Sequence, residues 1–97
     1  MTTKLTATEW PKTLKKLPNW EQTEGKDAIK RTFTFTDFNA AFTFMTSIAL
    51  RAEQMNHHPE WSNVYNRVEV KLTTHDAGGV TEKDISLALF MDELRPS

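Results

Sequence analysis

The chain has no cysteine, and this absence excludes several kinds of chemistry. A protein without cysteine forms no disulfide bond, offers no thiolate nucleophile and has no thiolate ligand for a metal ion. A small domain without disulfides fits a reducing compartment, and the first residues carry no apolar segment typical of a signal peptide. We therefore expect a cytoplasmic protein.

Long apolar runs and an excess of one charge are also missing. No apolar run approaches the roughly 20 residues needed to span a bilayer, so we expect no membrane segment. The 12 basic and 13 acidic residues leave a net charge of −1. Because nucleic-acid binding depends on an excess of basic residues along the phosphates, the composition predicts no direct nucleic-acid binding. The length and the lack of repeats or linkers predict one domain, residues 1–97.

Apolar residues with helical spacing predict the first two helices. In the first, Trp10, Leu14 and Leu17 recur at i, i+4 and i+7. The second is the longest pattern in the chain, begins at a cap on Thr36 or Asp37 and covers about 18 residues. Its expected apolar stripe comprises Phe38, Ala41, Phe42, Met45, Ile48, Ala49, Ala52 and Met55. We expect the phenylalanine and methionine side chains of this stripe to lie in the core.

Alternation of apolar and polar residues predicts half-buried strands between these helices. A short strand at 20–23 and a second strand at 28–35 form the first hairpin. Arg31 lies on the apolar side of the second strand, which an edge position or a partner at an interface would explain. The alternation from 61 to 74 is interrupted at Asn66, so this segment is either one long strand or two strands joined by a turn. The elements predict an α+β fold with helices over an antiparallel sheet.

The last helix is expected to begin with a capping box, in which Thr81 is the N-cap and Asp84 reaches back to it. Apolar residues occupy most of the circumference of this helix, which indicates burial on more than one side. We expect one set to face the sheet and the other to face a second copy of the chain. The two sets are Ile85, Ala88 and Leu89, and Leu87, Phe90, Met91 and Leu94. The sequence therefore predicts a homo-oligomer.

All three histidines of the chain lie within residues 53–84, at the expected ends of elements and outside the core. His57 and His58 are followed by Pro59, which biases His58 away from helical backbone, so this pair ends the second helix. His75 follows an alternating strand and precedes the turn-forming sequence Asp-Ala-Gly-Gly. Since an imidazole titrates near pH ~6.5, histidines that meet at one edge of the domain can supply an acid and a base at neutral pH.

A zinc site is the main alternative for three histidines, because three imidazoles can hold zinc with one open position. Adjacent residues in extended backbone point to opposite sides, however, so His57 and His58 do not converge on one ion. The chain also has no HExxH sequence and no histidines at i, i+4. We therefore expect acid–base chemistry without metal or cofactor. For any one histidine, the simpler alternative is a polar surface residue without a function. Glu53 can likewise be only a solvated side chain, and Asp84 only a helix cap.

The spacing of these residues resembles the signature of the pterin-4a-carbinolamine dehydratases. In this chain the matching residues, spread over 32 positions, are Glu53, His57-His58-Pro59, Tyr65, His75 and Asp84. The segments DAI, FTDFNAAFTFMT, NHHPEW, NVYNRV and TTHDAGG also resemble the family, so the similarity covers nearly the whole chain. The resemblance implies the order α-β-β-α-β-β-α, a two-layer fold and a four-stranded antiparallel sheet covered by helices. It also favours a turn near Asn66.

The resemblance implies dehydration of 4a-hydroxytetrahydrobiopterin, or of a related 4a-hydroxytetrahydropterin, to the quinonoid dihydropterin. In the family this reaction recycles pterin after aromatic amino-acid hydroxylation. His57, His58 and His75 match the three active-site histidines, and we expect His57 and His75 to be the acid–base pair. Water leaves C4a while a proton leaves N5, so the reaction needs an acid and a base but no redox cofactor.

Residues next to the histidines match positions that lie along the substrate in the family. They are Asn56, Pro59, Trp61, Thr73, Thr74 and Asp76. Glu53 and Asp84 are expected to support the histidines. Family members are dimers or dimers of dimers, so the resemblance implies a homodimer or a homotetramer. It also implies an alternative function as a protein-interaction module, because animal members act as dimerisation cofactors of a homeodomain transcription factor.

Overall fold

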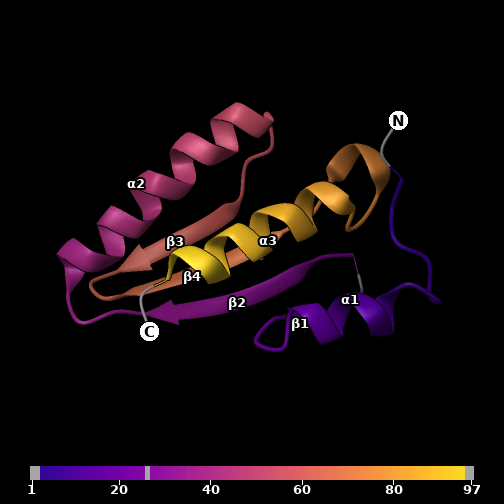
Figure 1. The fold of residues 1–97 in the computed structure, drawn as a ribbon, viewed down its shortest axis with the longest axis horizontal. Coiled ribbons are helices and arrows are strands. Elements are labelled where there is room, and N and C mark those ends of the chain that lie inside the picture. The colour runs from indigo at the N-terminus through magenta and orange to yellow at the C-terminus, as the bar shows by residue number, and fades with distance from the viewer. Residues whose placement is uncertain (1–2, 26, 96–97) are drawn as a thin grey trace.

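The computed structural model describes residues 3–25 and 27–95 (Figure 1). The helices are α1 (Trp10–Lys16), α2 (Phe38–Met55) and α3 (Glu82–Leu94), and a 3-10 turn, η1 (His75–Ala77), precedes α3. The strands are β1 (Glu21–Gln22), β2 (Ile29–Thr34), β3 (Glu60–Val64) and β4 (Arg67–Leu72). The predicted order α-β-β-α-β-β-α is confirmed. β1 and β2 are each one residue shorter at both ends than the strands expected from the sequence.

The four strands form one antiparallel sheet with the order β1-β2-β4-β3. The central pair, β2 and β4, is in register from Ile29 opposite Leu72 to Thr34 opposite Arg67. Buried and exposed residues alternate along β4, so only one face of the sheet is covered, and the helices lie on that face. None of the described helices is long and apolar enough to cross a membrane.

The interruption at Asn66 is a turn between two strands, as the resemblance implied. Tyr65 has φ 51°, which reverses the chain between β3 and β4. The side-chain amide of Asn66 donates to the carbonyl oxygen of Phe35 at 2.9 Å, and the backbone N–H of Phe35 donates to the carbonyl of Asn66 at 2.8 Å. These two bonds tie the β3–β4 hairpin to the end of β2.

The core is built around Phe33 on the central strand β2. Its ring centroid lies 4.8 Å from that of Phe44 on α2 and 5.9 Å from that of Trp20, with the Trp20 ring edge-on. Aromatic pairs at these separations add to the free energy of burial. The other large core side chains come from the sheet, from α2 and α3, and from the residues that directly follow α1 and β2; they include Leu17, Ile29, Phe35, Ile48, Val68, Val70, Leu72, Leu87 and Met91.

The buried face of α2 differs from the expected apolar stripe. Phe44 is buried with Ile48, whereas Phe38 and Phe42 are 48% and 53% exposed and pack on each other at 5.5 Å. The expectation that these two phenylalanines lie in the core is therefore wrong. α2 carries two apolar stripes, and the sheet contacts the one that is centred on Ile48. The second stripe, which runs through Phe38, Phe42 and Ala49, faces solvent.

The inward face of α3 also differs from the predicted division. Leu87, Ala88 and Met91 are fully buried, whereas Leu89 and Leu94 remain 37% and 38% exposed. The core thus takes residues from both expected sets. The reason is Asp84, which is itself fully buried and precedes the three core residues at i+3, i+4 and i+7. The first residue of this buried face is charged, so a prediction based on apolar residues alone did not identify the face.

Arg31 does not lie on an edge strand, and it has a partner within its own chain. β2 is a central strand, and the guanidinium of Arg31 donates to Oδ1 of Asp92 on α3 at 2.5 Å. The same oxygen accepts from Nε1 of Trp20 at 2.8 Å, and the guanidinium lies 4.3 Å from the centroid of the Phe33 ring. A half-buried arginine therefore joins α3 to the sheet through a carboxylate that two donors share.

Replacing Asp92 by alanine should lower the free energy of unfolding by about 1–3 kcal/mol, because Arg31 and Trp20 would both lose their acceptor. Glu93→Ala is the matched control, since Glu93 is the exposed neighbour, and it should change the stability by less than about 0.5 kcal/mol. Urea denaturation followed by circular dichroism measures both values. Equal stability of the two variants would show that the Arg31–Asp92 pair does not stabilise the fold.

Candidate functional site

The two adjacent histidines that follow α2 have side chains that point in different directions. Asn56 caps the helix with φ 52°, a left-handed conformation that asparagine tolerates, and the backbone N–H of His57 donates to the carbonyl of Ala52 at 3.0 Å. After this reversal Nε2 of His57 lies against Asp84, whereas Nε2 of His58 lies 2.9 Å from Oε1 of Glu53. The expectation that Glu53 orients a histidine agrees with this contact.

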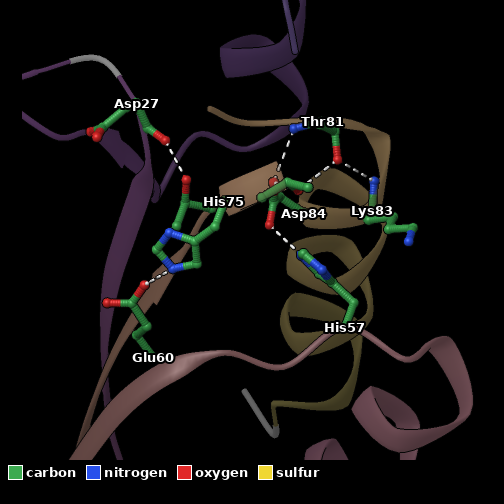
Figure 2. A network of polar contacts seen from close by, with 9 residues as sticks. Asp27, His57, Glu60, His75, Thr81, Lys83 and Asp84 are labelled. Carbon is green, nitrogen blue, oxygen red and sulfur yellow. Dashed lines mark hydrogen bonds and ion pairs between the residues drawn. The ribbon is translucent and has the colours of Figure 1, made fainter. Parts of the chain in front are cut away.

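Asp84 and His57 form a buried pair (Figure 2). Nε2 of His57 is 2.5 Å from Oδ1 of Asp84, and the two residues are 8% and 0% exposed. The expectation that His57 lies outside the core is therefore wrong. The second oxygen of Asp84 accepts from the backbone N–H of Thr81 at 2.9 Å and from the hydroxyl of Thr74 at 2.8 Å. The predicted capping box is present, and it also anchors a histidine.

His75 is presented at the tip of a tight loop. Thr74 pairs with Gly79 across this loop, where the backbone N–H of Thr74 donates to the carbonyl of Gly79 at 2.9 Å. Gly78 has φ 74°, a conformation that glycine adopts without a steric penalty, and it closes η1. His75 is exposed, as predicted, and its Nε2 lies 3.0 Å from Oε2 of Glu60 at the start of β3 (Figure 2).

Each histidine therefore has a carboxylate of its own, and one of these carboxylates was not expected. Glu60 is 15 residues from His75 in the sequence and joins it only because β3 pairs with β4. The one sequence signal for Glu60 is its place directly after the His-His-Pro segment. Glu53 is on α2 and Asp84 on α3, so the three carboxylates come from three different elements.

Both threonines expected along the substrate use their hydroxyl groups within the protein. Thr73 donates to the carbonyl of Asp27 at 2.6 Å, and Thr74 donates to Asp84. Asn56 and Asp76 are exposed beside the histidines, and Pro59 is half-buried. Asn56, Pro59 and Asp76 thus lie next to the histidines in the chain, whereas both threonine hydroxyls bond to groups of the protein itself.

Trp61 lies on the wall of a broad hollow of about 830 Å³ over the sheet. Glu60, Lys30 and Lys71 also line this hollow. Among the described residues that line it, none is a histidine. Glu60 thus belongs both to the wall of the hollow and to the pair with His75, and it connects the two parts of the surface.

The arrangement suits proton transfer better than metal binding. Within residues 3–25 and 27–95, no three side chains of His, Asp or Glu are placed to hold one ion. A carboxylate on one ring nitrogen orients the imidazole and leaves its other nitrogen to exchange a proton with a bound molecule. Three imidazoles arranged in this way supply both an acid and a base.

Known proteins with related sequences share one description. A family model described as Pterin 4 alpha carbinolamine dehydratase matches residues 3–94. A relative from Burkholderia multivorans, named "Putative pterin-4-alpha-carbinolamine dehydratase", is 59% identical over 92 residues, which are 95% of this chain and 90% of the relative. A relative of the same name from Burkholderia vietnamiensis is 57% identical over 91 residues, with 94% and 89% covered.

A solved structure has the same fold. It is described as a transcriptional coactivator/pterin dehydratase from Brucella melitensis and superimposes with a TM-score of 0.94 at 47% sequence identity. The match covers 97% of this chain and 100% of the other.

Purified protein incubated with zinc and then dialysed should retain far less than one zinc ion per chain by elemental analysis. The reason is that the three imidazoles are directed at three separate carboxylates. Retention of one zinc per chain that His58→Ala abolishes would contradict this prediction and would restore the zinc-site alternative.

Proposed function

The chain belongs to the pterin-4a-carbinolamine dehydratase family, and we propose that it dehydrates 4a-hydroxytetrahydrobiopterin, or a related 4a-hydroxytetrahydropterin, to the quinonoid dihydropterin. The protein is accordingly a hydro-lyase. The observation that carries the proposal is the set of three histidines, each paired with a carboxylate, within the segment that the family model matches. Recycling of pterin after aromatic amino-acid hydroxylation is the role that this reaction would serve.

The proposed reaction exchanges two protons and no electrons with the protein. The C4a–O bond of the substrate breaks, the N5–H bond breaks, and a C4a=N5 double bond forms. An acid gives a proton to the leaving hydroxyl, which departs as water, and a base takes the proton from N5. Because one proton is given and one is taken, the total charge of the two side chains is unchanged, and each side chain returns to its starting protonation state when it exchanges a proton with solvent.

We assign the acid and base roles to His57 and His75. The ring of His57 is held firmly by buried Asp84, and the ring of His75 is exposed to an approaching substrate and paired with Glu60. Acid–base assistance of this kind typically contributes about 10²–10⁴-fold to a rate. His58 is exposed, and its assigned role is substrate binding.

The outer face of α2 is the surface that we propose for self-association, in place of the α3 face expected from the sequence. Leu87 and Met91 of the expected α3 set are buried in the protomer, so they are not available to a partner. Phe38 and Phe42 instead present two exposed rings on α2 that pack on each other at a tilt of 32°. Burying them at about 1.5–3 kcal/mol each favours association, and pairing across a two-fold axis uses the same face twice.

The same face favours a second candidate function. The solved relative is described as a transcriptional coactivator as well as a pterin dehydratase, and an exposed apolar helix face suits docking of an amphipathic helix from another protein. Since Phe38 and Phe42 lie on α2 away from the histidine–carboxylate pairs, dehydration and helix binding could coexist in one protein. They should be separable by substitution.

His75→Ala should lower kcat by about 10²-fold or more without changing the melting temperature, because His75 is exposed and only its proton transfer is lost. His57→Ala should lower both kcat and the melting temperature, because Asp84 would remain buried without its ring partner. Stopped-flow dehydration of chemically generated carbinolamine measures the rate, and Lys15→Ala on α1 is the exposed control. Wild-type turnover in His75→Ala would remove His75 from the mechanism, and an inactive wild-type protein would refute the proposed function.

The double variant Phe38→Glu, Phe42→Glu should sediment as a smaller species than the wild type, because four added charges would lie in a two-fold contact. Val64→Glu, Tyr65→Glu is the matched control, since these side chains are 64% and 61% exposed at the β3–β4 turn, and it should keep the wild-type mass. Sedimentation equilibrium at micromolar concentration measures all three proteins. A monomeric wild type would exclude self-association through this face.

A further inference from the structure

The hydrogen bonds around Asp84 determine where each proton lies. The hydroxyl of Thr74 has one proton, which it donates to Oδ2 of Asp84 at 2.8 Å. The hydroxyls of Thr74 and Thr81 are also 2.8 Å apart, so the proton between them must come from Thr81. Oγ1 of Thr81 in turn accepts from the backbone N–H of Lys83 at 3.2 Å. The three donors, Lys83 N–H, the Thr81 hydroxyl and the Thr74 hydroxyl, therefore form a series that ends at the carboxylate of Asp84.

The charge of Asp84 is well accommodated although the side chain is fully buried. Oδ2 receives two donors, the Thr74 hydroxyl and the Thr81 backbone N–H, and the carboxylate lies in the first turn of α3, where the helix dipole favours negative charge. An ionised carboxylate has no proton to donate. The contact of 2.5 Å between Oδ1 and the ring of His57 therefore requires a proton on Nε2.

We propose that Asp84, Thr74 and Thr81 fix neutral His57 as the Nε2–H tautomer, with Nδ1 as its proton acceptor. In the proposed dehydration, on which this last step rests, His57 is then the base that takes the N5 proton, and His75 is the acid. Among the described residues, the only buried side-chain nitrogen without a partner is Nε of Arg95. No described residue bonds Nδ1 of His57, so this nitrogen keeps access to the surface through the exposed 8% of the residue.

Asp84, Thr74 and Thr81 are positioning residues in this scheme, since they act on the reaction through the ring of His57. The amide of Asp84→Asn would accept the Thr74 and Thr81 donors on its oxygen and turn its NH₂ group toward Nε2. Nε2 would then have to accept, and the ring proton would move to Nδ1. The base would be lost although the ring stayed in place, and kcat should fall by about 10²–10⁴-fold.

The tautomer can be read from the ¹⁵N chemical shifts of the histidine rings in long-range ¹H–¹⁵N spectra of uniformly labelled protein. Spectra recorded at increasing pH, until the ring shifts of His57 no longer change, report the neutral ring. Wild-type His57 should show a protonated Nε2 and an unprotonated Nδ1. Asp84→Asn should show the reverse, and its kcat should fall in the same sample conditions.

Thr74→Val provides a second test if Asp84→Asn does not fold. It removes one donor from Asp84 and leaves the Thr81 hydroxyl without its acceptor, so the tautomer should become mixed and kcat should fall by about 10-fold. Thr74→Ser restores the hydroxyl and should restore the wild-type spectrum and most of the rate. Thr13→Val, a buried threonine on α1, is the matched control and should leave both measurements unchanged.

A protonated Nδ1 in wild-type His57, or a folded Asp84→Asn with the wild-type tautomer, would overturn the proposal. Thr74→Val with an unchanged spectrum and rate would overturn it as well. The ring spectra need no substrate, so they test the tautomer independently of the reaction. Absence of dehydration by a wild-type protein with the expected tautomer would refute the proposed function and the base role, and would leave the tautomer assignment standing.

Discussion

The buried carboxylate of Asp84 is the interaction on which the rest of the site depends. A charge in the interior is tolerated only when donors surround it, and Asp84 meets the backbone of Thr81, the hydroxyl of Thr74 and the ring of His57. These donors belong to the start of α3, the segment after β4 and the end of α2. Satisfying one charge therefore gathers three distant segments, and it also directs Leu87, one turn further along α3, into the core.

The three histidine–carboxylate pairs differ in their surroundings, and this difference suits different tasks. The side chains of His57 and Asp84 are only 10% and 0% exposed, so solvent screens this pair little and the ring is held in one orientation. The pairs that contain His58 and His75 are open to solvent, which screens their attraction and makes them weak contributors to stability. The role of these two exposed pairs is better explained if each carboxylate orients its imidazole toward a bound molecule. One fixed ring and two accessible rings can together hold a substrate and exchange its protons.

The family signature, the three helices and the caps of α2 and α3 could be predicted from the sequence because they depend on residues close together in the chain, whereas the division of residues 61–74 into two strands rested on the resemblance. Pro59 after two histidines ends a helix through its own backbone geometry, and the Thr81–Asp84 capping box spans a single turn. The positions of His57 and His75 at element ends follow from the same local rules. The sequence was also sufficient to predict that an antiparallel sheet lies under the helices, since alternation along β4 reports a single buried face.

The tertiary structure alone decided which helix faces are buried and which charges meet. α2 offers two apolar stripes, and only contact with the sheet selects the one with Phe44 and leaves Phe42 exposed. Arg31 pairs with Asp92, and Glu60 pairs with the ring of His75. In both pairs the two residues lie on elements that are far apart in the sequence. A local sequence pattern shows which kind of side chain is present but not which residue that side chain contacts. The partner is set by strand register and by the need to satisfy buried charge, and both arise only when the whole chain has packed.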